Sequence, residues 1–186
     1  MSVESQEDDS RVAALFENLS QLTVAIETCA KGRLQMPTLM LIYSSIDILS
    51  YLGMPAGKLK HTSQDFCDWA DTYFMTNLNN RACSSMDLYS ARCGLLHTMT
   101  YESDLTIKQA AKSIFYAWGD HKESDLQQLI RQIGRNDIAL HVDGMIAALS
   151  KGLQDFLQAI QDDPKKLANA LGKASKMFTA IKMMKK

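Results

Sequence analysis

The sequence predicts a mainly α-helical protein: a bundle of four or five helices, a smaller helical or α+β extension, and a basic C-terminal helix. The 186 residues include only three prolines and nine glycines, and long segments carry apolar residues at helical spacing. Apolar content of 46% and charged content of 22% are ordinary for a soluble globular protein. We expect the bundle over residues 10–101, an extension packed on it over 102–163, and the basic helix over 164–186.

Four helices account for the expected bundle. Apolar periodicity, cap residues and stop signals place them over about 10–31, 37–53, 63–74 and 84–99. The second is apolar nearly all round, so it should be central. Asp47 is the exception within it, because a buried carboxylate needs a cationic partner from elsewhere in the fold.

The extension has a mixed pattern. Residues 113–118 have strand composition and are followed by a turn, and residues 138–142 form a second short strand or the start of a helix. Helices are expected over 124–133 and 142–160, the latter ended by Asp162, Asp163 and Pro164.

The last segment is basic and amphipathic. Its apolar residues recur every three or four positions from Leu167 to Ile181, the stripe of a helix that packs against a partner or the body of the protein. The lysines around it could contact RNA phosphates or an acidic partner, and membrane binding is disfavoured because the stripe holds alanine and one aromatic ring. The candidate contacts are Lys165, Lys166, Lys173, Lys176 and Lys182.

The net charge of −1 argues against bulk electrostatic coating of nucleic acid. The four cysteines form no CxxC pair, the N-terminus is acidic, and the longest apolar run is too polar to span a bilayer, so a cytoplasmic protein with free thiols is expected. No metal and no cofactor is predicted, because the cysteines and histidines lack ligand spacing. His61, His121 and His141 are interpreted as surface or capping residues.

The most informative segment runs from Asp87 to His97, within the fourth helix. It combines Arg92, a permanent cation, with His97, which exchanges protons near neutral pH. A cation that stabilises phosphate charge and a proton shuttle are the minimum parts for cutting a phosphodiester without a metal. The two residues differ by about 140° around an ideal helix, but the long arginine stem can swing toward the histidine.

Four polar residues are expected to support the site: Asp47, Asp87, Tyr89 and Tyr101. Tyr101 follows His97 by four residues, so the two side chains share one ridge of the helix if the helix continues that far. The structural alternative is an Arg92 paired with Asp47 or Asp87, and a His97 hydrogen-bonded in the core. Cys93 shares a helix face with His97, which would suit half a metal site or a thiolate–imidazole pair, but a buried, packing cysteine is favoured.

An Arg-x4-His motif in a late helix of a small bundle, after a polar loop, resembles the HEPN superfamily of toxin and defence ribonucleases and related non-catalytic modules. The resemblance covers residues 10–101. It implies a homodimer in which both subunits contribute to a metal-independent ribonuclease site. Arg92 would bind the scissile phosphate, and His97 would assist proton transfer while the 2′-hydroxyl acts as nucleophile.

The residue directly after the arginine departs from that pattern. Active members commonly have Asn, Asp or His there, whereas this chain has Cys93, whose thiol is a poor hydrogen-bonding group. Two functions therefore stay open. One is an endoribonuclease of toxin or defence type, and the other is a non-catalytic HEPN-like module that binds a nucleic acid or a partner protein such as an antitoxin.

Overall fold

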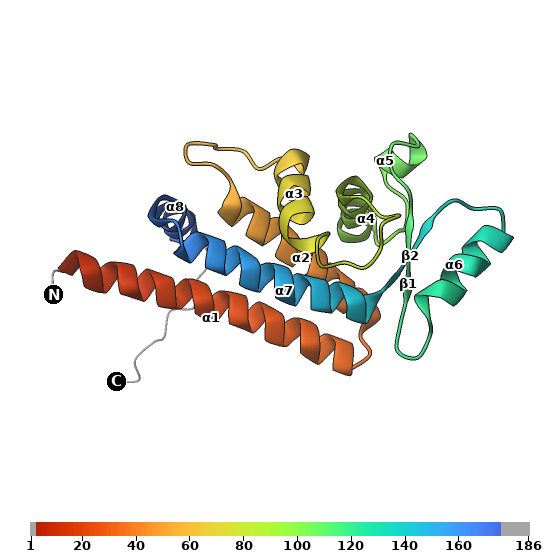
Figure 1. The fold of residues 1–186 in the computed structure, drawn as a ribbon, viewed down its shortest axis with the longest axis horizontal. Coiled ribbons are helices and arrows are strands. Elements are labelled where there is room, and N and C mark those ends of the chain that lie inside the picture. The colour runs from red at the N-terminus through yellow and green to blue at the C-terminus, as the bar shows by residue number, and fades with distance from the viewer. Residues whose placement is uncertain (1–2, 176–186) are drawn as a thin grey trace.

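Helices make up most of the structure, a computed structural model that describes the backbone of residues 3–175 and the side chains from residue 11 onward. The N-terminal helices are α1 (Val3–Lys31), α2 (Gln35–Gly53), α3 (Ser63–Trp69), which continues as the short π-helix η1 (Ala70–Phe74), and α4 (Ser85–Thr98). The expected bundle helices are confirmed, and the mainly α fold class with them (Figure 1). Lys176, Lys182 and the end of the predicted C-terminal helix lie outside the described residues.

The second half of the chain adds a small sheet and two longer helices. Its elements are α5 (Asp104–Ile107), β1 (Ile114–Ala117), α6 (Glu123–Gln132), β2 (Ile138–His141), α7 (Val142–Gln161) and α8 (Pro164–Ala174). The strands pair in parallel, from Ile114 opposite Ile138 to Ala117 opposite His141, and α6 makes the crossover that parallel pairing requires. The predicted strand within residues 113–118 is confirmed, and of the two alternatives left open for residues 138–142 the strand is the one that forms. Helix α5 was not predicted.

Helix α2 occupies the centre, as its all-round apolar sequence predicts. It packs against α1, α3, α4, α7 and α8. Ile42, Tyr43 and Ile46 are fully buried on it, and the Tyr43 hydroxyl lies 2.7 Å from the Tyr116 hydroxyl of β1. This hydrogen bond joins the bundle to the sheet and satisfies two hydroxyls that would otherwise be buried without partners.

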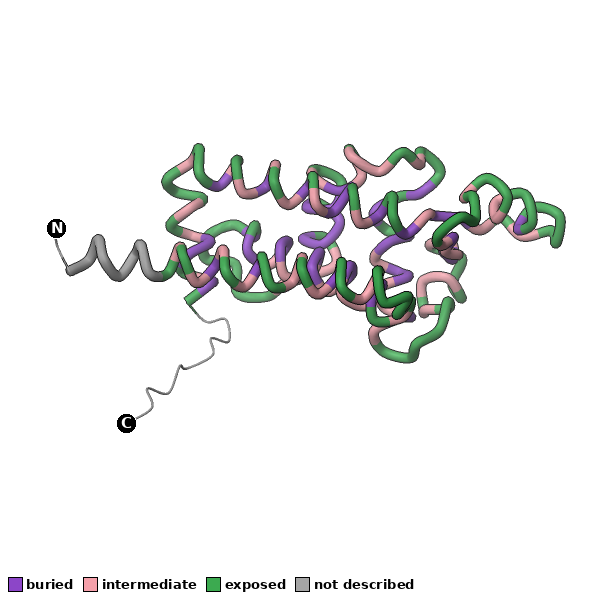
Figure 2. Tube along the Cα trace, turned by 90° about the horizontal axis from the view of Figure 1, so that it is seen from below, coloured by how far each residue is buried: buried purple, intermediate pink, exposed green. Residues whose placement is uncertain are grey.

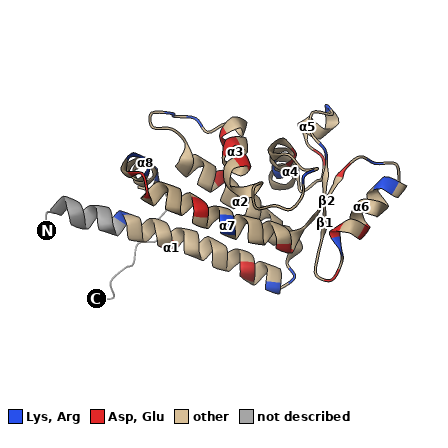
Figure 3. Ribbon diagram, in the orientation of Figure 1, with Lys and Arg blue, Asp and Glu red and all other residues tan. Residues whose placement is uncertain are grey.

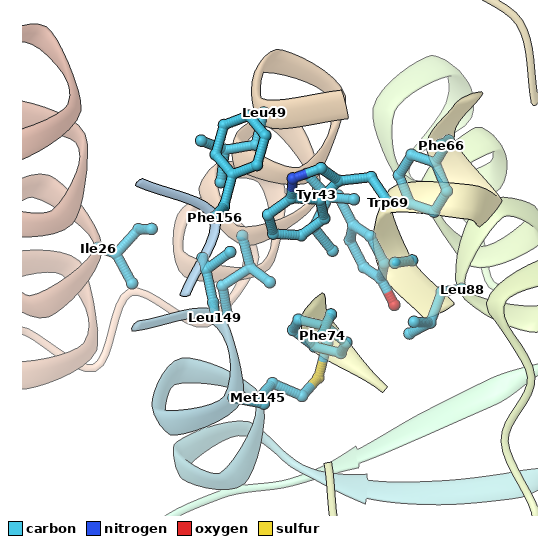
Figure 4. Close-up of a cluster of buried hydrophobic side chains, with 14 of the residues drawn as sticks. Ile26, Tyr43, Leu49, Phe66, Trp69, Phe74, Leu88, Met145, Leu149 and Phe156 are labelled. Carbon is cyan, nitrogen blue, oxygen red and sulfur yellow. The ribbon is translucent and has the colours of Figure 1, made fainter. Parts of the chain in front are cut away.

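One continuous hydrophobic core runs through the described part of the chain, from α1 to α8. Met145, Leu149 and Phe156 of α7 lie in the same cluster as Tyr43 and the aromatic residues of α3 and η1 (Figure 4). Buried residues gather along the inward faces of the helices (Figure 2). The segment after residue 101 therefore shares its core with the helices before it. In the described part of the chain, no helix has the length and apolar run that a membrane span requires.

The basic helix α8 packs on the body of the protein. Asp163 caps it by accepting from two backbone N–H groups, Pro164 fills its first turn, and Leu171 and Ala174 are buried against the bundle. Lys173 donates to the carbonyl oxygens of Leu52 and Met54 at the end of α2, where a cation complements the helix dipole. Lys173 therefore makes a structural contact between α8 and the end of α2.

Helix α3 begins with a capping box that also fixes the loop before it. Asp65 accepts from the Thr62 backbone and hydroxyl and forms an ion pair with Lys58. Burial of the Asp65 carboxylate acts to raise its pKa, but these hydrogen bonds outweigh burial and lower the pKa to about 2.

We expect Asp65→Asn to lower the free energy of unfolding by about 1–2 kcal/mol at pH 7, because the substitution removes the ion pair and weakens the cap. A carboxylate with a depressed folded pKa stabilises the protein above its unfolded pKa, and that contribution is lost as pH falls toward the folded value. Urea unfolding from pH 7 down to pH 2 should show the gap between wild type and variant closing below about pH 4. A gap that stays constant over this range would contradict the assignment.

Candidate active site

Helix α4 carries the Arg-x4-His motif, and its first turn is fixed by Asp87. The Ser84 hydroxyl accepts from the Asp87 backbone, while the Asp87 carboxylate accepts from the Ser84 backbone and hydroxyl and, at 2.7 Å, from the Lys112 backbone. Asp87 is buried, and both its oxygens are occupied. It therefore holds the start of the helix in place, with both carboxylate oxygens bonded to Ser84 and Lys112.

Arg92 joins Asp47 to His97. Its Nε donates to Asp47 Oδ2 at 2.7 Å, and its Nη1 donates to His97 Nε2 at 3.2 Å. The expected cationic partner of Asp47 is therefore confirmed as Arg92. The swing of the arginine stem overcomes the 140° between the two positions on the helix.

The hydrogen bond to Arg92 also defines the proton positions on His97. A guanidinium only donates, so Nε2 of His97 is the unprotonated nitrogen in this contact. Partial burial acts to lower the pKa of Arg92, but the Asp47 carboxylate outweighs it and the pKa is raised. The arginine is a permanent cation with a fixed orientation.

Arg92 and Asp47 are partly accessible to solvent, and His97 is more so. The side chains of Arg92 and Asp47 are 22% and 20% exposed, and His97 is exposed. The interpretation of His97 as a core histidine is therefore wrong. A solute can reach both functional groups.

An open groove of about 600 Å³ runs along this end of α4. Tyr89, Cys93 and His97 form one wall, and the returning chain over residues 98–107 forms the other. The helix ends at Thr98, one residue after His97, because Met99 takes a left-handed conformation with φ of 54°. The chain then folds back over Gly94, where an added Cβ would lie 2.6 Å from the carbonyl oxygen of Glu102.

Tyr101 lies away from His97, because α4 ends before reaching it. Its ring packs 5.8 Å from the Phe115 ring, and the Arg135 guanidinium lies 5.2 Å from its centre. The prediction that Tyr101 shares the ridge of His97 is wrong. The cause is the left-handed residue Met99, which no glycine signals in the sequence.

Cys93 lies with Tyr89 in the wall of the groove and directly follows Arg92 in the sequence. Its thiol acts to raise the pKa of both neighbours, and burial is the main cause of the raised pKa of Tyr89. No hydrogen bond between Cys93 and His97 is present in the described part of the chain. Nor do the described residues place three or more His, Cys, Asp or Glu side chains together as a metal site.

His61 is a further residue of this region, although its sequence context predicts only a surface or capping role. It follows α2 in the loop before α3, and its Nε2 lies 2.8 Å from the Ser50 hydroxyl, one turn along α2 from Asp47. Burial is the main cause of its lowered pKa, and Asp47 and Arg92 are among the charges that act on it. Its residue type was the only sequence signal available, because the loop is irregular.

The remaining predicted lysines lie elsewhere. Lys165 and Lys166 are exposed at the start of α8 and line a second cleft, of about 520 Å³, with residues from α2, α3 and α7. This cleft shares no lining residue with the α4 groove.

Comparison with known proteins returns no match, whether to a family model, to a curated protein or to a solved structure. The functional argument therefore depends on the geometry of Arg92, His97 and their neighbours.

We expect Gly94→Ala to destabilise the protein by about 1–3 kcal/mol, because its methyl group would collide with backbone that cannot move independently. Gly144→Ala is the matched control, since an added Cβ there meets nothing within 4 Å. That control should leave the free energy of unfolding unchanged or slightly higher. Equal stabilities for the two variants in urea unfolding would contradict the close approach of the returning chain.

A double-mutant cycle measures the ion pair between α2 and α4. Asp47→Asn, Arg92→Met and the double variant should give a coupling energy of about 1–2 kcal/mol, because the pair is well aligned and mostly shielded from water. Methionine retains the apolar stem of the arginine. Additive effects in chemical denaturation would show that the pair contributes nothing to stability.

Proposed function

We propose that this protein is a metal-independent endoribonuclease of the HEPN type, a toxin or defence enzyme acting as a homodimer. The observation that carries the proposal is the single accessible unit formed by Arg92, Asp47 and His97 beside a groove. The chemistry of the unit suits RNA, which carries both an anionic phosphate and an adjacent 2′-hydroxyl nucleophile.

Arg92 supplies the phosphate site. Of the five N–H bonds of its guanidinium, one goes to Asp47 and one to His97, so the fork keeps donors for phosphate oxygens. Asp47 holds the guanidinium in orientation, so little rearrangement is needed when phosphate charge develops in the transition state.

His97 supplies proton transfer at the same phosphate. In the reaction the 2′-oxygen bonds to phosphorus, the bond from phosphorus to O5′ breaks, and a 2′,3′-cyclic phosphate and a 5′-hydroxyl result. The 2′-hydroxyl loses its proton and O5′ gains one. These proton transfers can be catalysed by imidazole, without a metal. His97 lies within hydrogen-bonding distance of the arginine that would hold this phosphate.

The homodimer follows from the HEPN resemblance, in which two subunits face one another across their Arg-x4-His motifs. The exposure of His97 and of Met99 beside it leaves this end of α4 open to a second subunit or to a regulatory partner such as an antitoxin. Exposed Lys165 and Lys166 are candidates for more distant RNA contacts.

A non-catalytic module is the second candidate, and the residue after Arg92 favours it. Cys93 stands where active HEPN members carry a stronger hydrogen-bonding group, and its thiol is among the groups that act on the pKa of Arg92. In this alternative Arg92 serves its ion pair with Asp47, and the groove binds a nucleic acid or partner protein without cutting it.

Total cellular RNA incubated with the purified protein and excess chelator distinguishes the two functions. From the wild type we expect discrete fragments ending in 2′,3′-cyclic phosphate. Cleavage by His97→Ala should be slower by a factor of about 100 or more, because that variant lacks the group that transfers protons. The control is His121→Ala, which removes an exposed histidine far along the chain.

Intact RNA with the wild type, at concentrations where it binds RNA, would favour the binding module. Equal cleavage by wild type and His97→Ala would reject His97 as part of the active site.

A further inference from the structure

Ser50 holds His61 in a fixed orientation beside the ion pair. The Ser50 hydroxyl donates its one hydrogen to the Asp47 carbonyl oxygen at 3.0 Å, so its oxygen accepts from His61 Nε2 at 2.8 Å. His61 therefore carries its proton on Nε2. Its Nδ1 has no hydrogen-bond partner among the described residues, so its lone pair is free in the neutral ring.

Each of the two helices that form the ion pair thus has an imidazole attached to it. His97 contacts Arg92 on α4, and His61 is bonded to the turn of α2 that carries Asp47. The charged groups that act on His61 are Asp47 from α2, Asp65 from α3, Arg92 from α4 and Lys58 from its own loop. Lysines of this loop appear blue in Figure 3, above the acidic residues of α3.

The balance of these influences favours the neutral ring. Burial, the largest contribution, lowers the pKa of His61, and Arg92 and Lys58 act in the same direction against the two carboxylates. A half-buried histidine that stays neutral with a free Nδ1 has the form of a general base.

RNA transesterification moves two protons at two different oxygens. The 2′-oxygen and O5′ lie on opposite sides of phosphorus in an in-line displacement, so one imidazole does not reach both at once. The proposed site therefore needs a second proton-transfer group in addition to His97.

We propose that His61 is this second group: its Nδ1 takes the proton of the attacking 2′-hydroxyl, and His97 delivers a proton to the departing O5′. The inference rests on the proposed ribonuclease function. As the 2′-oxygen bonds to phosphorus, His61 becomes an imidazolium. For this step His97 starts as the imidazolium: once a phosphate oxygen replaces it as the acceptor of the Arg92 N–H, its Nε2 takes a proton from water. When the bond to O5′ breaks, that proton passes from His97 to O5′, and exchange with water restores both rings.

The test uses an RNA oligonucleotide that the wild type cleaves, and the same oligonucleotide with sulfur replacing O5′ at the scissile phosphate. A thiolate departs without protonation, so the sulfur substrate needs the base but no acid. The variants are His61→Gln, whose amide still donates to Ser50, His97→Gln, and His121→Gln as the control.

We expect His61→Gln to cleave both substrates about 100-fold more slowly. The wild-type rate should rise with pH through a midpoint below about 6.5, the ordinary histidine value, because the base acts when deprotonated. That rising limb should disappear in His61→Gln. His97→Gln should be slow on the oxygen substrate and recover on the sulfur substrate, while His121→Gln matches the wild type on both.

Wild-type rates in His61→Gln, or slow cleavage that keeps the rising limb, would overturn the role of His61 and leave the ribonuclease standing. Recovery of His61→Gln on the sulfur substrate would overturn its assignment as the base. A wild type that cleaves no RNA would overturn the ribonuclease and this inference together.

Discussion

The ion pair between Arg92 and Asp47 is the interaction on which the candidate site depends. It joins α4 to the central helix α2, and it orients a guanidinium that would otherwise extend into solvent from the far side of α4. The same guanidinium then reaches His97. The two motif residues point about 140° apart on their helix. Without Asp47 to orient the guanidinium, the Arg-x4-His spacing would not by itself bring Arg92 and His97 together.

The surrounding fold keeps that pair in place with ordinary structural devices. Asp87 and Ser84 cap the start of α4, and the close approach at Gly94 brings the returning chain against its end. The Asp65 capping box fixes the loop that carries His61. The cap of α4 and the close backbone approach at Gly94 thus hold the two walls of the groove together, which favours a site that is organised before any ligand binds.

Much of the fold was predictable because its signals are local. Apolar periodicity marked the long helices, Asp162, Asp163 and Pro164 marked the end of α7, and β-branched and aromatic composition marked the first strand. The partner of Asp47 was also predictable in kind, since a shielded carboxylate requires a cation. The end of α4 was not, because Met99 adopts a left-handed conformation that the sequence gives no reason to expect.

Contacts between distant residues account for the other misses. Lys173 looked like a free surface lysine, yet it caps α2 from 119 residues away. His61 looked like a loop histidine, and only the folded structure brings it to Ser50 beside Asp47.

Nitrogen NMR of selectively labelled histidine tests the central geometry most directly, because it distinguishes protonated from unprotonated ring nitrogens. At a pH where the rings are neutral, we expect His97 to carry its proton on Nδ1, with Nε2 accepting from Arg92, and to lose this preference in Asp47→Asn, where the guanidinium is released. A wild-type His97 protonated on Nε2, or one that is unaffected by Asp47→Asn, would contradict the arrangement on which the proposed function depends.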